Sequence, residues 1–62
     1  MTITTFQRKC TPGTAVFNAS SGEKGIVQKI SKENDKALVL YEDGDKAWRP
    51  YFAIELDKPQ QQ

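Results

Sequence analysis

The sequence predicts a small all-β domain: a five-stranded barrel with one short 3-10 turn before the last strand. Strand-sized apolar segments recur along the chain, turns rich in Gly, Pro and Asp separate them, and no stretch has the spacing of a long amphipathic helix. A chain of 62 residues has room for one such domain. We place the barrel at residues 13–57, after a lead segment at 1–12 and before a disordered tail at 58–62.

The first half of the barrel is expected to hold two strands. Residues 14–17 follow a Thr-Pro-Gly break and form the first strand, and a polar loop over 19–25 leads to the second strand at 26–30. Alternation of side chains along the second strand predicts two faces. One face carries Ile26, Gln28 and Ile30, and the other carries Val27 and Lys29. In the lead segment, Ile3 and Phe6 either pack on the barrel or stay loose.

The second half gives the clearest strand of the chain. Residues 37–41 read Ala-Leu-Val-Leu-Tyr, and a nearly unbroken apolar run of this length is typical of a strand covered on both faces. Asp43-Gly44 follows as a tight hairpin turn, because Gly accepts a positive φ. Residues 46–49 form the returning strand, which Pro50 ends. A 3-10 turn at 51–53 and a last strand at 54–56 complete the barrel.

Composition and charge limit the classes of partner and the cellular compartment that we expect for this protein. Nine Lys and Arg against eight Asp and Glu give a net charge of +1, without the basic excess of an electrostatic nucleic-acid binder. The single Cys10 cannot form an internal disulfide, and no apolar stretch is long enough for a signal peptide or a membrane span. We therefore expect a cytoplasmic protein with no membrane partner.

The inventory of reactive side chains predicts a protein that is not an enzyme. The chain has no histidine, which excludes every triad that uses imidazole as its base. Cys10 follows Arg8 and Lys9, whose charges would lower the pKa of its thiol, but no base accompanies it, and we expect an ordinary small side chain. One Cys without His cannot build a zinc site, and the Asp-Gly turn lacks the ligand spacing of a calcium loop. No cofactor and no metal are expected.

The order of these motifs resembles a known fold family. The stretch 37–56, which runs apolar strand, Tyr41, acidic Gly turn, strand, short turn and closing Ile-Glu-Leu, is similar to the second half of Tudor and related SH3-like domains. Gly13-Thr-Ala-Val-Phe17 followed by Gly25-Ile-Val27 resembles their first half. The resemblance covers about residues 13–56 and implies an SH3-like barrel whose ligand groove is shallow and lined by aromatic side chains.

Two further outlines are similar over shorter patterns. Thr-Pro-Gly-Thr-x-Val, Gly-x-x-Gly-x-x-x-x-Ile and the closing Ala-Ile-Glu-Leu resemble the YdfZ family of small enterobacterial proteins, for which the resemblance implies selenium binding through cysteine. Cys10 lies outside the matched pattern. The outline also looks like the type II dihydrofolate reductase, a tetramer of SH3-like chains with a shared pore. At the position of the Val-Gln-Ile-Tyr strand of that enzyme, this chain has Ala-Trp-Arg-Pro at residues 47–50.

Aromatic side chains near turns are the main indication of a binding site. We expect Phe17, Phe52 and one of the two tyrosines to serve the core, Trp48 to be the best surface residue and Tyr51 the second. The leading hypothesis is a non-catalytic adaptor module that binds a protein partner through an aromatic and basic patch. Its expected ligand-binding residues are Trp48, Arg49, Tyr51, Tyr41 and Phe17.

Two alternatives remain open at this point. A nucleic-acid-binding domain, as in KOW-like SH3-like proteins, would use Lys24, Lys29, Lys46 and Arg49. An enzyme built at the shared pore of a homo-oligomer is the third and least favoured class, although self-association itself is a common way to stabilise so small a scaffold. The interleaving of acidic residues with these lysines favours the protein-binding reading.

Overall fold

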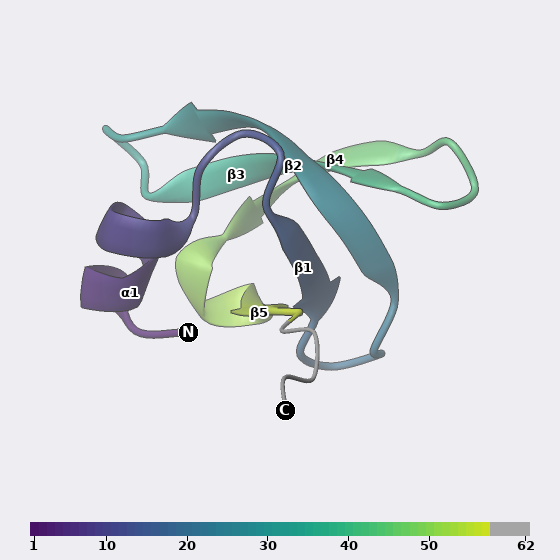
Figure 1. Cartoon of the computed structure of the whole chain (residues 1–62), viewed down its shortest axis with the longest axis horizontal. Helices are drawn as coiled ribbons and strands as arrows, with labels where there is room; N and C mark the ends of the chain where they lie inside the picture. The colour runs from purple at the N-terminus through teal and green to yellow at the C-terminus, as the bar shows by residue number, and fades with distance from the viewer. Residues whose placement is uncertain (58–62) are drawn as a thin grey trace.

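A computed structural model describes residues 1–57, which form one antiparallel sheet preceded by a short helix (Figure 1). The elements are α1 (Ile3–Lys9), β1 (Ala15–Asn18), β2 (Lys24–Ser31), β3 (Lys36–Tyr41), β4 (Lys46–Pro50), the 3-10 turn η1 (Tyr51–Ala53) and β5 (Ile54–Leu56). Five strands and a 3-10 turn before the last one confirm the predicted all-β class. The predicted tail at 58–62 lies outside the described residues.

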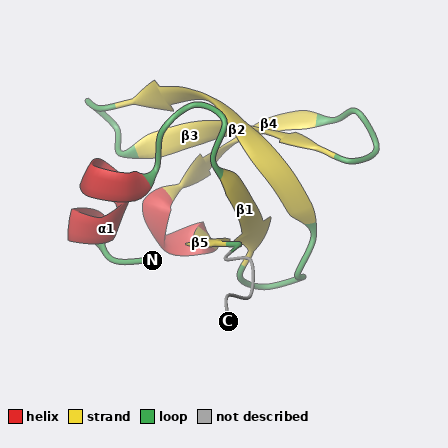
Figure 2. Ribbon diagram, viewed as in Figure 1, coloured by secondary structure: helices red, strands yellow, loops and turns green. Residues whose placement is uncertain are grey.

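The strands follow the order β4-β3-β2-β1-β5, and every neighbouring pair is antiparallel. β1 lies between β2 and β5, while β4 and β5 stand at the two edges. Within residues 1–57 no backbone ladder joins β4 to β5, so the sheet is open and closure into a barrel stays a prediction. The helix α1 and the turn η1 lie on the same side of β2 and β3 (Figure 2).

The hairpin between β3 and β4 is built by the predicted Asp-Gly turn. Gly44 has φ 95°, which L-residues rarely adopt. The Tyr41 amide donates to the Asp45 carbonyl at 2.8 Å, and the Asp45 amide donates to the Asp43 carboxylate at 3.0 Å. Residues 42–44 therefore form a three-residue hairpin loop that ends with Gly44 in the left-handed region. This loop is one residue longer than the shortest, two-residue hairpin loop.

The helix α1 settles what the sequence leaves open in the lead segment. Thr2 caps it, since its hydroxyl oxygen accepts from the Thr5 amide at 3.2 Å. A helix of this length is marginal alone, so packing has to hold it. Phe6 supplies that packing: it is 2% exposed, and its ring centroid lies 6.1 Å from that of Tyr51 in η1. The Met1 ammonium also donates to the Ile54 carbonyl at 2.9 Å.

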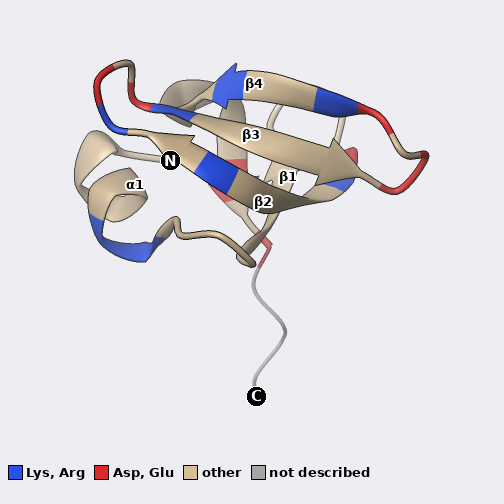
Figure 3. Ribbon diagram, turned by 90° about the horizontal axis from the view of Figure 1, so that it is seen from above, with Lys and Arg blue, Asp and Glu red and all other residues tan. Residues whose placement is uncertain are grey.

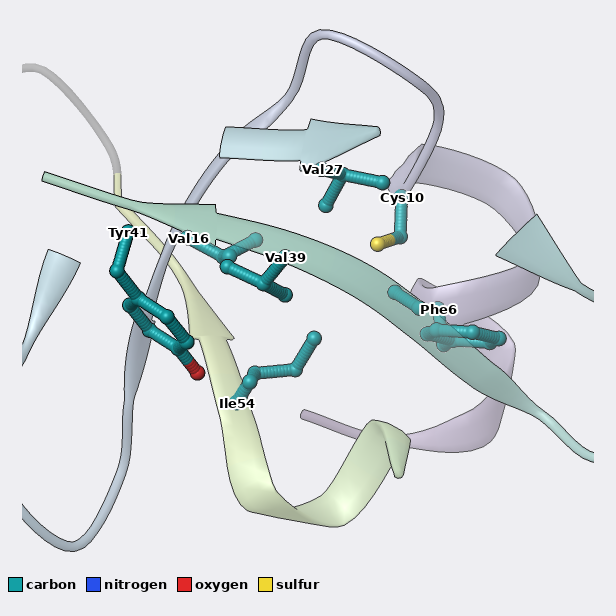
Figure 4. Packing of buried hydrophobic residues seen from close by; sticks show 8 residues of the cluster. Phe6, Cys10, Val16, Val27, Val39, Tyr41 and Ile54 are labelled. Atoms are coloured by element: carbon teal, nitrogen blue, oxygen red, sulfur yellow. The ribbon is translucent and has the colours of Figure 1, made fainter. Parts of the chain in front are cut away.

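The core lies between the sheet and α1 (Figure 4). Its buried members come from the helix, its C-terminal cap and four strands, and they are Phe6, Cys10, Val16, Val27, Ala37, Val39, Tyr41 and Ile54. Tyr41 is the core tyrosine that the sequence predicts. Phe52 was expected beside it, and that prediction is wrong, because Phe52 is 68% exposed on η1. The prediction that Phe17 serves the core is also wrong, because Phe17 is half-buried on the opposite face of the sheet. Phe6 from the helix provides the buried phenylalanine.

A β-bulge overturns the alternation predicted for the second strand. Val27 pairs with Val39, and the next pair joins Lys29 to Leu38, so Gln28 is the extra residue. The bulge moves Ile30 to the core side, opposite Ala37, while Ile26 stays on the other side. Ile26 and Ile30 therefore do not share a face. Within residues 1–57 no helix is long and apolar enough to span a membrane.

Candidate interaction surface

The face of the sheet turned away from the core carries apolar side chains over which residues 1–57 place no second layer. We call it the outer face and define it by Ala15, Ile26, Leu38, Leu40 and Trp48. Trp48 is 47% exposed and Ile26 is 41% exposed, while the two leucines are half-buried. The strand predicted to be covered on both faces, β3, is fully buried on one face only, where Ala37, Val39 and Tyr41 lie, while Leu38 and Leu40 on the other face are half-buried.

The strand register brings these side chains together. Across the sheet, Ala15 is opposite Ile26 and Ile26 is opposite Leu40. In the next row Leu38 is opposite Trp48. Directly opposed residues on one face have Cβ atoms about 4.5–5.5 Å apart. The outer face is therefore one continuous apolar strip that crosses from β1 to β4.

Lysines border this strip. Lys24 and Lys29 lie on β2, Lys36 begins β3 and Lys46 begins β4, and all four are exposed. Figure 3 shows basic segments along the strands and acidic segments gathered in the connecting turns. Lys24 lies 3.9 Å from the Asp57 carboxylate, and the other three lysines form no ion pair within residues 1–57. The strip is thus flanked by positive charge on the strands, with negative charge at the ends of the hairpins.

A hollow of about 240 Å³ lies at the β1 side of the strip. Ala15, Ile26 and Leu40 give it apolar walls, and Lys24, Glu42 and Asp57 also line it. Gly25 contributes backbone without a side chain, and this glycine is required: a Cβ there would meet a Val39 methyl at 2.5 Å. The hollow gives the outer face a concave part.

The predicted patch of Trp48, Arg49 and Tyr51 is distributed over different parts of the structure. Successive side chains of a strand point to opposite faces, so Trp48 belongs to the outer face and Arg49 to the core side. Tyr51 is half-buried in η1, with its ring against Phe6 and, at 5.4 Å between centroids, against Phe52. Of these three, Trp48 alone lies on the outer face.

Tyr41 and Arg49 form a structural network on the core side. The Tyr41 hydroxyl donates to Asn18 Oδ1 at 2.6 Å, and Arg49 Nε donates to the same hydroxyl at 2.9 Å. Tyr41 is 4% exposed and Asn18 8%. The guanidinium carbon lies 5.7 Å from the Tyr41 ring centroid, which is consistent with contact at the hydroxyl edge of the ring. The network links β1, β3 and β4 and gives the buried Asn18 Oδ1 a hydrogen-bond donor.

Phe17 and three of the four residues assigned to nucleic-acid binding lie on the side of the sheet turned away from the core. Phe17 is half-buried on β1, opposite Lys24 of β2 and Glu55 of β5. Of the residues assigned to nucleic-acid binding, Lys24, Lys29 and Lys46 share the outer face with Trp48, whereas Arg49 does not. The structure therefore keeps the three lysines together and separates the arginine from them.

A second hollow, of about 480 Å³, opens between α1 and the β2–β3 hairpin. Phe6, Cys10 and Ile30 line it, with Lys32 and Asp35 also among the lining residues. Burial raises the pKa of the Cys10 thiol, which overrides the lowering expected from Arg8 and Lys9 and leaves less thiolate at neutral pH. Within residues 1–57, no three or more His, Cys, Asp or Glu side chains gather where they could hold a metal ion.

The sequence matches neither a model of a known protein family nor a curated protein. Sequence reasoning identified Trp48 but missed Ile26, Leu38 and Leu40. The signal for the leucines was present in the apolar run at 37–41, since a strand with apolar residues on both sides needs cover on both sides.

Proposed function

We propose that this protein is a small non-catalytic interaction module of the SH3-like type, which binds a protein partner on its outer face. The order of four strands, a 3-10 turn and a short fifth strand supports the SH3-like assignment. The observation that carries the binding proposal is the uncovered side of β3. Leu38 and Leu40 join Ile26 and Trp48 in one apolar strip on a sheet that has no second layer on that side among residues 1–57.

The physical reason is the cost of leaving such a strip in water. Burying apolar surface contributes about 25 cal/mol per Å², and Trp is among the residues that dominate interface energetics. Contiguous exposed apolar surface with a polar border is a common mark of a protein-binding site. Here the border consists of lysines whose stems can also cover apolar surface.

Affinity capture from a cell extract, with the bound proteins identified by mass spectrometry, tests the proposal. Trp48→Ala removes the most exposed side chain of the strip, and Phe52→Ala is the matched control, because Phe52 is an exposed aromatic on η1, away from the strip. We expect proteins that bind the wild type to be lost with Trp48→Ala and kept with Phe52→Ala. Capture that is insensitive to Trp48→Ala, or equally sensitive to both changes, contradicts the proposal.

Nucleic acid is a second candidate, since Lys24, Lys29 and Lys46 share the outer face with a tryptophan. Base stacking on an exposed aromatic ring and lysine contacts to phosphate are the usual means of binding single strands. Titration with a single-stranded oligonucleotide at low and moderate salt tests this candidate. Binding through phosphate has to weaken steeply as salt rises. No binding at low salt eliminates it.

A further inference from the structure

The charge around the strip identifies the chemistry of its partner. We propose that the outer face binds an acidic polypeptide segment whose aliphatic side chains lie on the strip and whose carboxylates meet the lysines. This inference rests on the proposed function and adds to it the class of partner.

The first argument is electrostatic. Lys29, Lys36 and Lys46 are exposed, lie on three adjacent strands and have no ionic partner within residues 1–57. Lys29 is opposite Leu38, and Leu38 is opposite Trp48, so this lysine continues the apolar row of Leu38 and Trp48. Lys46 continues the row of Ile26 and Leu40 in the same way. An apolar row that ends in a lysine matches a segment in which aliphatic and acidic side chains lie close together.

The second argument is steric. The hollow of about 240 Å³ between Ile26 and Leu40 is larger than the apolar cavities of about 150 Å³ that accept a benzene ring. It therefore has room for an aliphatic side chain of the partner. Beyond the hollow, the paired side chains of Leu38 and Trp48 provide the contact area. One side chain in the hollow fixes the register of the segment, and the lysines then select its charge.

The distribution of charge disfavours the other two occupants. Glu33 and Asp35 lie in the turn at one end of β3, and Glu42, Asp43 and Asp45 lie at the other end, so a nucleic-acid strand that extends past the strip would meet carboxylates. A second copy packed face to face would place the lysine-bordered strips against each other, because the acidic residues next to β2, β3 and β4 lie in the turns and Glu55 lies on the edge strand β5. A short peptide avoids both conflicts when its aliphatic side chain occupies the hollow, which Glu42 and Asp57 also line, and its carboxylates lie beside Lys29 and Lys46.

Selection from a random peptide display library on the immobilised full chain tests the proposal. The wild type, Trp48→Ala and Ile26→Ser are screened in parallel, and the enriched peptides are compared with the starting library. We expect wild-type selection to enrich Asp and Glu next to aliphatic residues, and both variants to lose that enrichment. Circular dichroism establishes that each variant is folded.

Two charge-reversed proteins complete the test. Lys29→Glu with Lys46→Glu changes the outer face, and Arg8→Glu with Lys9→Glu changes the net charge equally on α1. We expect the first to weaken binding of an enriched peptide by about tenfold or more, because attraction becomes repulsion, and the second to change it by less than about twofold. Affinity of the wild type for the peptide should fall as salt rises.

The outcomes separate this inference from the function on which it rests. Enriched peptides that depend on Trp48 but are neutral or basic overturn the acidic partner and leave the interaction module intact. Selection that yields no Trp48-dependent peptide overturns the interaction module itself. A single-stranded oligonucleotide that binds more tightly than any enriched peptide, and depends on Trp48 and on salt, overturns the acidic peptide in favour of nucleic acid. A dimer in light scattering that Ile26→Ser dissociates overturns it in favour of a second copy.

Discussion

Removing the hydroxyl of Tyr41 tests whether this residue serves the fold or a ligand. In Tyr41→Phe, Asn18 Oδ1 loses the donor at 2.6 Å and stays buried, and Arg49 Nε loses the acceptor at 2.9 Å. Leaving a buried polar atom without a partner costs about 1–3 kcal/mol. Arg49 is half-buried, so water can replace much of its lost contact. We expect the free energy of unfolding to fall by about 2 kcal/mol in total.

Urea and thermal unfolding, followed by circular dichroism, measure this loss. For a domain of this size a loss of about 2 kcal/mol lowers Tm by roughly 8–16 °C. Tyr51→Phe is the control, because the Tyr51 hydroxyl makes no hydrogen bond within residues 1–57, and its expected loss is below about 0.5 kcal/mol. A double-mutant cycle with Asn18→Ala should show coupling between Asn18 and Tyr41. A Tyr41→Phe protein as stable as the wild type would refute the structural role.

Three other changes probe the fold away from this network. Gly25→Ala places a Cβ 2.5 Å from a Val39 methyl and should cost about 1–3 kcal/mol in a denaturation curve; a neutral result would mean that β2 and β3 are less closely packed. Phe6→Ala should cost about 3–5 kcal/mol, and a folded spectrum with unchanged Tm would show that α1 does not belong to the core. Burial raises the pKa of the Cys10 thiol, so its contribution to stability is present below the ordinary pKa of about 8.5 and is lost as pH rises through the higher folded pKa. Between pH 8 and 10 the wild type should therefore lose more stability than Cys10→Ala, and parallel pH profiles would contradict the burial of this thiol.

The strands were predictable because their signals are local. The apolar run at 37–41 and the Asp43-Gly44 turn identify a hairpin without reference to the rest of the chain. The helix α1 carries no such signal, because it is short and is held by Phe6, whose contacts come from distant residues. The bulge at Gln28 also depends on pairing with β3, and it places Ile30 on the face opposite Ile26, although the two were predicted to share a face.

The candidate site was predictable in part. The exposure of Trp48 follows from its position on an edge strand beside charged residues. Trp48 and Arg49 were assigned to one patch because of their residue types. The alternation of side chains along a strand was sufficient to predict that these two neighbours point to opposite faces. The contribution of Ile26 was not predictable, because it depends on which face of β2 the core takes. Whether a face has cover is a property of the whole chain and not of a segment.

Chemical-shift mapping of the isotope-labelled protein during titration with an enriched acidic peptide tests the central claim most directly. If the outer face is the binding surface, the largest amide shifts will fall on β2, β3 and β4, around Ile26, Leu38, Leu40 and Trp48. Shifts centred on the hollow beside Phe6 and Lys32, or on Arg49 and Tyr51, would contradict the account.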